Sequence, residues 1–169
     1  ANCFDWAYMA SKITLEHNTP VVLLSDGYLG NGAEPWKIKS TLEMPEIKAR
    51  IAKENEEYQP YARDKKTLVR KLALPGTKGL EHRIGGLEKE DITGNVSYEA
   101  KNHEKMVGIR SEKIKQIANI IPKQKIFGEP KGELLVIGWG GTYGSLYSAV
   151  NNLFNKGEKI GLCHFNYIN

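Results

Sequence analysis

The sequence predicts a mixed α/β protein with parallel strands, and three apolar stretches carry that prediction. Residues 21–24 and 134–137 are continuous apolar runs, which are typical of strands covered on both faces of a parallel sheet. Residues 142–157 have helical periodicity and separate the second run from a third apolar stretch that begins at Lys159. This last third therefore predicts a strand–helix–strand unit with a parallel crossover.

The first predicted strand is preceded by a helix and followed by a glycine-rich loop. Residues 3–17 repeat apolar side chains at roughly helical spacing, and Pro20 suits the first position of a strand. In open α/β sheets, ligands gather beyond the carboxyl ends of such strands. The candidate binding residues are therefore those of the loop: Ser25, Asp26, Gly27, Tyr28 and Asn31. A plain strand–helix connection is the alternative.

The middle of the chain lacks the apolar runs that are typical of core strands. Residues 46–57 are compatible with a short helix, and the remainder up to about Asn102 is rich in glycine, proline and charge. An irregular stretch of this length is usually functional or packs on a partner. Helical periodicity returns at His103, so a helix is predicted over about 104–121, where Pro122 ends it.

Composition narrows the functional classes. The 169 residues are 40% hydrophobic and 26% charged, as in soluble globular proteins. The sequence contains no run as long as a membrane span, no signal peptide and no CxxC motif, so a cytoplasmic protein without a membrane partner is expected. The net charge of +4 is mild, and lysines alternate with acidic residues. Nucleic-acid binding is not expected.

The glycines at 138–144 resemble a dinucleotide-binding loop but depart from its spacing. The G-x-G-x-x-G fingerprint would require a glycine where Tyr143 stands. The acidic residue that binds the ribose has no counterpart about twenty residues further on. We interpret these glycines as positions that let a helix start close to its strand.

The candidate catalytic residues lie in the middle segment and are Glu81, His82 and His103. A histidine beside a glutamate can transfer protons near neutral pH. The alternative is that the surrounding stretch, GLEHRIGG, orders a long loop or docks it on a partner subunit. His17 reads as a helix cap or surface residue, and 63–71 as a solvated or subunit-facing stretch. No metal site is predicted, because Asp26 and Asn31 supply too few oxygen ligands.

Two strands with one crossover cannot bury both faces of a parallel sheet. The sequence therefore reads as an internal piece of a longer chain.

Three stretches carry a family resemblance that spans nearly the whole chain. They are TPVVLLSDGYLGNGAEPW, PGTKGLEHRIGGLEKEDITGNVSYEAKNHEKM and LLVIGWGGTYGSLYSAV with the terminal HFNYIN. Together they resemble the alpha subunit of 2-oxoacid:ferredoxin oxidoreductases, most closely the 2-oxoglutarate type. Such enzymes decarboxylate a 2-oxoacid on thiamine diphosphate, pass two electrons through iron–sulfur centres to ferredoxin, and transfer the acyl group to coenzyme A.

The resemblance implies a domain plan. Residues 1–35 would end a pyrimidine-binding domain, 36–124 would form a connecting segment, and 125–169 would be the first βαβ unit of a transketolase-C-terminal-like domain. A beta subunit is the implied partner, with ferredoxin bound through the complex.

The cofactor ligands implied by the family fall outside this chain. The whole complex would hold thiamine diphosphate with Mg²⁺ and an iron–sulfur cluster. The family's tyrosine–proline–isoleucine–threonine–proline motif and pyrimidine-activating carboxylate have no match here, and two distant cysteines cannot ligate a cluster. The chain alone is therefore expected to be catalytically inactive.

Two other functions stay open from the residues. One is a transketolase-type thiamine enzyme without ferredoxin, which co-purification with an iron–sulfur beta subunit would exclude. The other is a non-catalytic α/β module that binds a nucleotide at the loop around Gly140, which a nucleotide titration would test.

Overall fold

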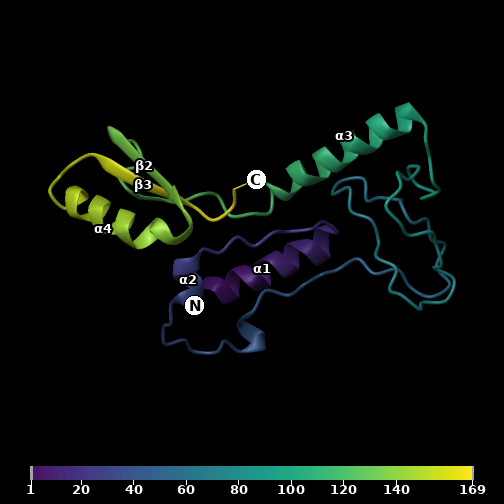
Figure 1. The fold of residues 1–169 in the computed structure, drawn as a ribbon, viewed down its shortest axis with the longest axis horizontal. Coiled ribbons are helices and arrows are strands. Elements are labelled where there is room, and N and C mark those ends of the chain that lie inside the picture. The colour runs from purple at the N-terminus through teal and green to yellow at the C-terminus, as the bar shows by residue number, and fades with distance from the viewer. Residues whose placement is uncertain (1, 169) are drawn as a thin grey trace. The chain divides into compact units, whose positions relative to one another are not determined.

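The computed structural model describes residues 2–168 and divides the chain into two compact units (Figure 1). The first unit consists of the chain up to Val22 together with Lys37–Ile121. The second consists of Leu23–Trp36 and the chain from Pro122 onward. Each unit is described by itself below.

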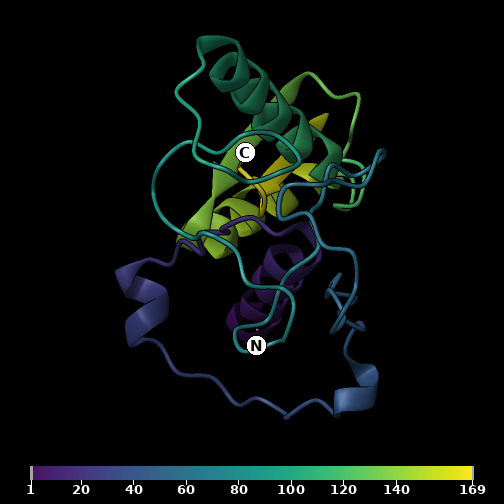
Figure 2. The same cartoon turned by 90° about the vertical axis from the view of Figure 1, so that its right-hand side faces the viewer.

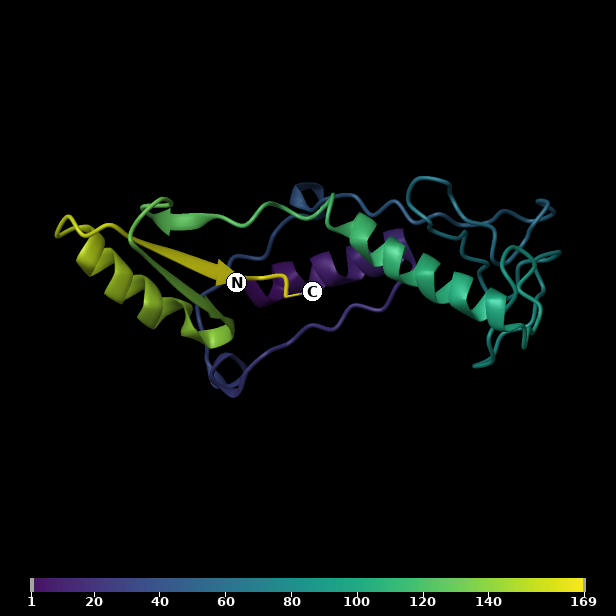
Figure 3. The same cartoon turned by 90° about the horizontal axis from the view of Figure 1, so that it is seen from above.

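The second unit contains a three-stranded sheet and one long helix. Its elements are α2 (Gly27–Asn31), β1 (Ile126–Gly128), β2 (Leu134–Trp139), the 3-10 turn η2 (Gly140–Thr142), α4 (Tyr143–Phe154) and β3 (Ile160–Phe165). The strand order is β1-β3-β2, with β2 parallel and β1 antiparallel to β3. Helix α4 lies along the sheet, as Figures 1 and 3 show. The predicted strand–helix–strand unit is confirmed.

The core of this unit lies between α4 and one face of the sheet. Val150 of α4 packs with Ile160 and Leu162 of β3, and each of the three is at most 3% exposed. Strand residues alternate between the two faces, so Leu135 and Ile137 point away from this core. These two side chains are 47% and 54% exposed. The exposed second face of β2 agrees with the expectation that two strands with one crossover cannot bury both faces of a parallel sheet.

The close approach of α4 to β2 depends on Gly138. A Cβ atom built at this position would lie 2.3 Å from Cδ1 of Leu146 and 3.1 Å from Oγ1 of Thr142. A larger residue would require the side chain of Leu146 or the helix that carries it to move. This geometry supports the interpretation that the glycine serves helix–strand packing.

Residues 21–24 do not form the predicted buried strand. Within residues 2–168 no segment pairs with them, and Val22 and Leu24 are 79% and 74% exposed. A strand forms only when a neighbouring strand satisfies its backbone groups, and the apolar run alone does not supply that neighbour. Conversely, no pattern in the sequence predicts β1. Only three residues long, it pairs with β3, and Gly128 (φ +84°) approaches Ile160 too closely for any side chain.

The first unit contains two long helices joined by irregular chain. Its elements are α1 (Asn2–His17), the 3-10 turn η1 (Thr41–Glu43) and α3 (Ala100–Ile117). Between 44 and 99 the structure has isolated bridges and turns but no helix or strand, and Figure 2 shows this part as loops. The largely irregular connection is confirmed, whereas the helix over 46–57 is wrong. There, Ala52 N–H donates to the carbonyl of Leu72 instead of joining a helix.

Helix α3 starts and ends about four residues before the predicted bounds. Asn102, in its first turn, holds the preceding loop: its Nδ2 donates to the carbonyl of Lys89, and its Oδ1 accepts from Asp91 N–H. These bonds extend the helix beyond what apolar periodicity indicates. Within residues 2–168, none of the helices has the length and apolarity that a bilayer crossing requires.

Candidate functional site

The predicted binding loop is held to the glycine turn after β2 by one carboxylate. Asp26 caps α2, where its Oδ1 accepts from Leu29 N–H at 2.9 Å. Its Oδ2 accepts from Gly141 N–H at 2.7 Å. Two glycine-rich stretches that are far apart in sequence are therefore joined inside the second unit. Each stretch is recognisable in the sequence, but no sequence signal indicates that the two are joined.

The side chains of this loop do not fit the diphosphate and Mg²⁺ of thiamine diphosphate. Both oxygens of Asp26 accept backbone N–H groups, and Asn31 Nδ2 donates to the carbonyl of Gly27 at 2.7 Å. Tyr28 is 82% exposed, and Ser25 is exposed as well. Across residues 2–168, no group of three His, Cys, Asp or Glu side chains is placed to hold a metal ion. The loop can position neighbouring groups, but it does not form a metal site by itself.

The three candidate acid–base residues have different surroundings in the structure. Nδ1 of His82 lies 2.8 Å from the carbonyl of Leu80, and its ring meets that of Tyr58 edge to face. Since a carbonyl only accepts, Nδ1 of His82 carries the hydrogen and Nε2 is the basic nitrogen. Nδ1 of His103 lies instead 2.6 Å from Oε2 of Glu88. Glu81 is exposed. The His82 side chain is thus oriented by Leu80 and Tyr58.

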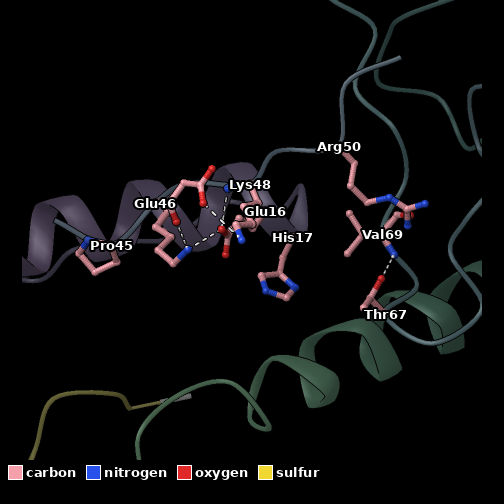
Figure 4. A pocket seen from close by; sticks show the side chains of 9 residues that line it. Glu16, His17, Pro45, Glu46, Lys48, Arg50, Thr67 and Val69 are labelled. Carbon is pink, nitrogen blue, oxygen red and sulfur yellow. Dashed lines mark hydrogen bonds and ion pairs between the residues drawn. The ribbon is translucent and has the colours of Figure 1, made fainter. Parts of the chain in front are cut away.

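A cavity of about 550 Å³ lies between α1 and the irregular segment (Figure 4). Its charges compensate one another: Lys12 Nζ lies 2.5 Å from both Glu16 Oε1 and the carbonyl of Glu46. Burial on its own raises the pKa of Glu16, but the hydrogen bonds from Lys12 and from Lys48 N–H hold this pKa below its usual value. Such paired groups fix the position of the segment on α1.

His17 lines the same cavity and is not the surface residue that its position suggested. It is 8% exposed, and its Nδ1 is buried without a hydrogen-bond partner among the described residues. Burial lowers the pKa of His17, with Glu16 acting in the opposite direction. The imidazole is therefore neutral at pH 7 and packs at the end of α1 (Figure 4).

A second cavity of the first unit, of about 750 Å³, has a different electrostatic character. We call it the cationic pocket. It lies between the end of α1, the irregular segment and α3. Its charged lining residues are Arg63, Arg70, Lys89, Arg110 and Lys113, with Glu88 as the only carboxylate and His103 beside it. Its apolar lining includes Leu68, Leu87, Met106, Ile109 and Ile114.

Two of these cations form ion pairs, and a third is buried and binds loop carbonyls. Arg63 forms an ion pair with Asp91, and Arg110 pairs with Glu88 at 3.1 Å. Hydrogen bonds from Arg110 and then His103 hold the pKa of Glu88 below its usual value. Lys89 is 3% exposed and donates to two loop carbonyls.

Arg70 and Lys113 have only neutral partners. The Arg70 guanidinium lies 4.2 Å from the centroid of the Tyr61 ring and donates to the carbonyl of Pro60 at 3.3 Å. Lys113 Nζ donates to the carbonyl of Asn18 at 2.8 Å. Among residues 2–168, neither cation takes part in an ion pair. Burial first, and then the charges of Arg70 and Arg63, lower the pKa of Lys113 to about 8.

Sequence reasoning missed this pocket. It gave 63–71 as a solvated or subunit-facing stretch, but within this chain Val69 is 2% exposed and the Arg63 side chain 11%. One signal was present: Lys113 lies seven residues after Met106 and four after Ile109, so a lysine occupies the apolar stripe of α3. A charged group in that stripe is costly to bury unless it is paired or hydrogen-bonded.

Comparisons with known proteins place the chain in a family. A family model described as "Pyruvate flavodoxin/ferredoxin oxidoreductase, thiamine diP-bdg" matches residues 1–102. The 2-oxoglutarate oxidoreductase subunit KorA of Mycobacterium tuberculosis (strain ATCC 25618 / H37Rv) is 46% identical over 171 residues, which cover 100% of this chain and 26% of that protein. The chain therefore spans about a quarter of the length of this curated relative.

A solved structure shares the fold. The 2-oxoglutarate:ferredoxin oxidoreductase from Magnetococcus marinus, solved with 2-oxoglutarate, coenzyme A and succinyl-CoA bound, matches 75% of this chain and 22% of its own chain. The TM-score is 0.67 at 23% sequence identity. The resemblance found in the sequence is thereby confirmed. The family model covers more than half of the residues of this chain. The chain therefore belongs to the thiamine-diphosphate-binding family of pyruvate flavodoxin/ferredoxin oxidoreductases.

Proposed function

We propose that the chain is part of the alpha subunit of a thiamine-diphosphate-dependent 2-oxoglutarate:ferredoxin oxidoreductase. The observation that carries this proposal is the 46% identity to a 2-oxoglutarate oxidoreductase subunit, because the match extends over the whole chain. The family match over residues 1–102 and the shared fold with a 2-oxoglutarate:ferredoxin oxidoreductase support it. Neither a transketolase-type enzyme nor a nucleotide-binding module is favoured by these comparisons.

The proposed reaction converts 2-oxoglutarate and coenzyme A to succinyl-CoA and carbon dioxide. It releases two electrons, which pass one at a time to ferredoxin. Thiamine diphosphate, held by residues outside those described, would supply the chemistry of the decarboxylation. The ligands of this cofactor, of its Mg²⁺ and of an iron–sulfur cluster would come from outside the described residues, because the side chains of the 25–31 loop do not fit them.

Within this enzyme we assign a positioning role to Asp26. Its two bonds hold α2 and the turn after β2 together, and the cofactor-facing segment remains the proposed loop of Ser25, Asp26, Gly27, Tyr28 and Asn31. The domain plan also stays a proposal, with a pyrimidine-binding end over 1–35, a connection over 36–124 and a transketolase-C-terminal-like start over 125–169. A beta subunit as partner and a cytoplasmic location complete it.

His82 is the acid–base candidate that the geometry supports best. Its basic Nε2 is set by the Nδ1 contact with Leu80, whereas His103 is held by the carboxylate of Glu88. Glu81 and His103 remain weaker candidates. In the assembled enzyme, His82→Gln is expected to lower kcat, whereas Glu81→Gln tests whether the adjacent carboxylate contributes.

Dye reduction by the assembled enzyme tests the proposed function. The alpha and beta subunits are mixed, and reduction of methyl viologen is followed with 2-oxoglutarate and coenzyme A. We expect reduction only when both subunits and both substrates are present, and no reduction by the 169-residue chain alone. Reduction by the chain alone would show that the chemistry lies among its own residues. Carbon–carbon bond formation without reduction of viologen would instead indicate the transketolase-type alternative.

A further inference from the structure

The cationic pocket combines a ligand-sized cavity with positive charges that have no counterion. Its volume of about 750 Å³ falls within the roughly 300–1,000 Å³ of small-molecule sites. After the pairs Arg63–Asp91 and Arg110–Glu88 are set aside, Arg70 and Lys113 have no ion-pair partner among residues 2–168. In the other cavity of this unit each lining lysine and arginine has an ion-pair partner: Lys12 pairs with Glu16, Lys48 with Glu46 and Arg50 with Asp64. The cations without such a partner are therefore a property of the cationic pocket.

The two cations are held in place before any ligand arrives. The ring of Tyr61 supports the guanidinium of Arg70, and the carbonyl of Asn18 fixes Lys113 Nζ. Fixed donors lose little conformational entropy on binding, which favours affinity. A guanidinium fork next to an ammonium group is also the donor pattern that phosphate and carboxylate dianions require.

The repulsion between Lys113 and the two arginines favours the binding of an anion in this pocket. Lys113 is held close to Arg70 and Arg63, and both charges disfavour its protonated form. A dianion between Arg70 and Lys113 would reverse that repulsion and raise the pKa of Lys113. The groups that face Lys113 are the Asn18 carbonyl at the end of α1 and the two arginines of the irregular segment. Glu88 also lines the pocket, but its carboxylate pairs with Arg110 and His103.

We propose that the cationic pocket binds a small molecule that carries a phosphate or dicarboxylate group next to a short apolar body. The anionic group lies between Arg70 and Lys113, and the apolar body packs on Leu68, Met106 and Ile109. All lining residues of this site belong to the first unit, whereas the 25–31 loop belongs to the second, and the proposal does not rest on the proposed enzymatic activity.

Isothermal titration calorimetry of the full chain at constant ionic strength tests this proposal. Phenyl phosphate tests binding of a phosphate group, and glutarate tests binding of a dicarboxylate. Phenol is the control that lacks an anionic group. We expect saturable one-site binding of at least one dianion and none of phenol. Arg70→Gln and Lys113→Met should each weaken it about 10- to 100-fold, as expected for the loss of one charge-assisted hydrogen bond.

The matched control is Lys115→Met, which removes an exposed lysine two residues away on the same helix and should leave binding unchanged. Arg70→Lys keeps the charge and is expected to bind more tightly than Arg70→Gln. Circular dichroism verifies that each variant is folded. Absence of saturable binding for both dianions, or equal weakening by Lys113→Met and Lys115→Met, would overturn the proposal. So would loss of binding on assembly with the beta subunit, because these cations would then serve a subunit contact.

Discussion

Replacing Leu162 by alanine tests the one-sided core of the second unit. Leu162 is 2% exposed in the central strand β3 and packs on the face that α4 covers. Truncating a buried leucine to alanine costs about 2–5 kcal/mol, because transfer free energy is lost and a cavity is left. The core holds Leu162 between Val136 and Phe127 of the flanking strands, which leaves little room for collapse. We therefore expect a loss in the upper half of that range.

The control variant is Leu135→Ala, on the opposite face of the same sheet. Leu135 is already 47% exposed, so its truncation loses about half of the 1.5–3 kcal/mol that burial of a whole side chain contributes, and it leaves no cavity. We expect a cost of about 1 kcal/mol. Urea denaturation of the chain, followed by circular dichroism and by hydrogen exchange of the β2 and β3 amides, measures both costs. Equal losses for the two variants would refute a core that lies on the α4 face alone.

Three further predictions concern single contacts. Hydrogen bonds from Thr67 and Lys66 N–H lower the pKa of Asp64 from 3.8 to about 2, so its stabilisation is present above pH 3.8 and lost as the pH falls towards 2. Acid titration of Asp64→Asn by circular dichroism should show a shallower loss of stability in that window, and an unchanged slope would contradict this cause. The pKa of Lys113 is about 8 when folded against 10.5 for a free lysine, so the unfolded chain binds more protons between these values and stability rises with pH there. Urea midpoints of Lys113→Met should lack that rise, and a rise equal to wild type would assign it to another group. At Gly141 a Cβ atom would lie 2.2 Å from Asp26 Oδ2, so Gly141→Ala should cost about 1–3 kcal/mol by breaking that hydrogen bond. Gly144→Ala, with no atom within 4 Å of its Cβ, should be neutral or stabilising in thermal melts, and equal costs would argue against the Asp26 contact.

The sequence predicted the β2–α4–β3 unit well because its signals are local. Two apolar runs flank a helical pattern, and the glycine at 138 marks where the helix must approach the strand. Strand β1 had no comparable signal, since its three residues become a strand only by pairing with β3 more than thirty residues later. The run at 21–24 failed for the complementary reason. Apolar residues indicate a tendency to be buried, but they do not identify the element that buries them.

The candidate sites were less predictable than the fold. Asp26 was selected as a ligand-binding residue, but a sequence cannot show that its carboxylate already accepts from Leu29 and Gly141. The cationic pocket gathers Arg70 and Lys113 from segments more than forty residues apart, so no spacing rule describes it. The lysine in the apolar stripe of α3 was the one local sign of such a site.

The proposed activity of the enzyme to which this chain belongs is the oxidation of 2-oxoglutarate. Its most direct test is the stoichiometry of the reaction catalysed by the assembled alpha and beta subunits. Succinyl-CoA is measured by mass spectrometry and reduced methyl viologen by absorbance in the same sample. The account predicts two reduced viologens for each succinyl-CoA, and faster turnover with 2-oxoglutarate than with pyruvate. Formation of acetyl-CoA from pyruvate at the higher rate, or reduced viologen without succinyl-CoA, would contradict it.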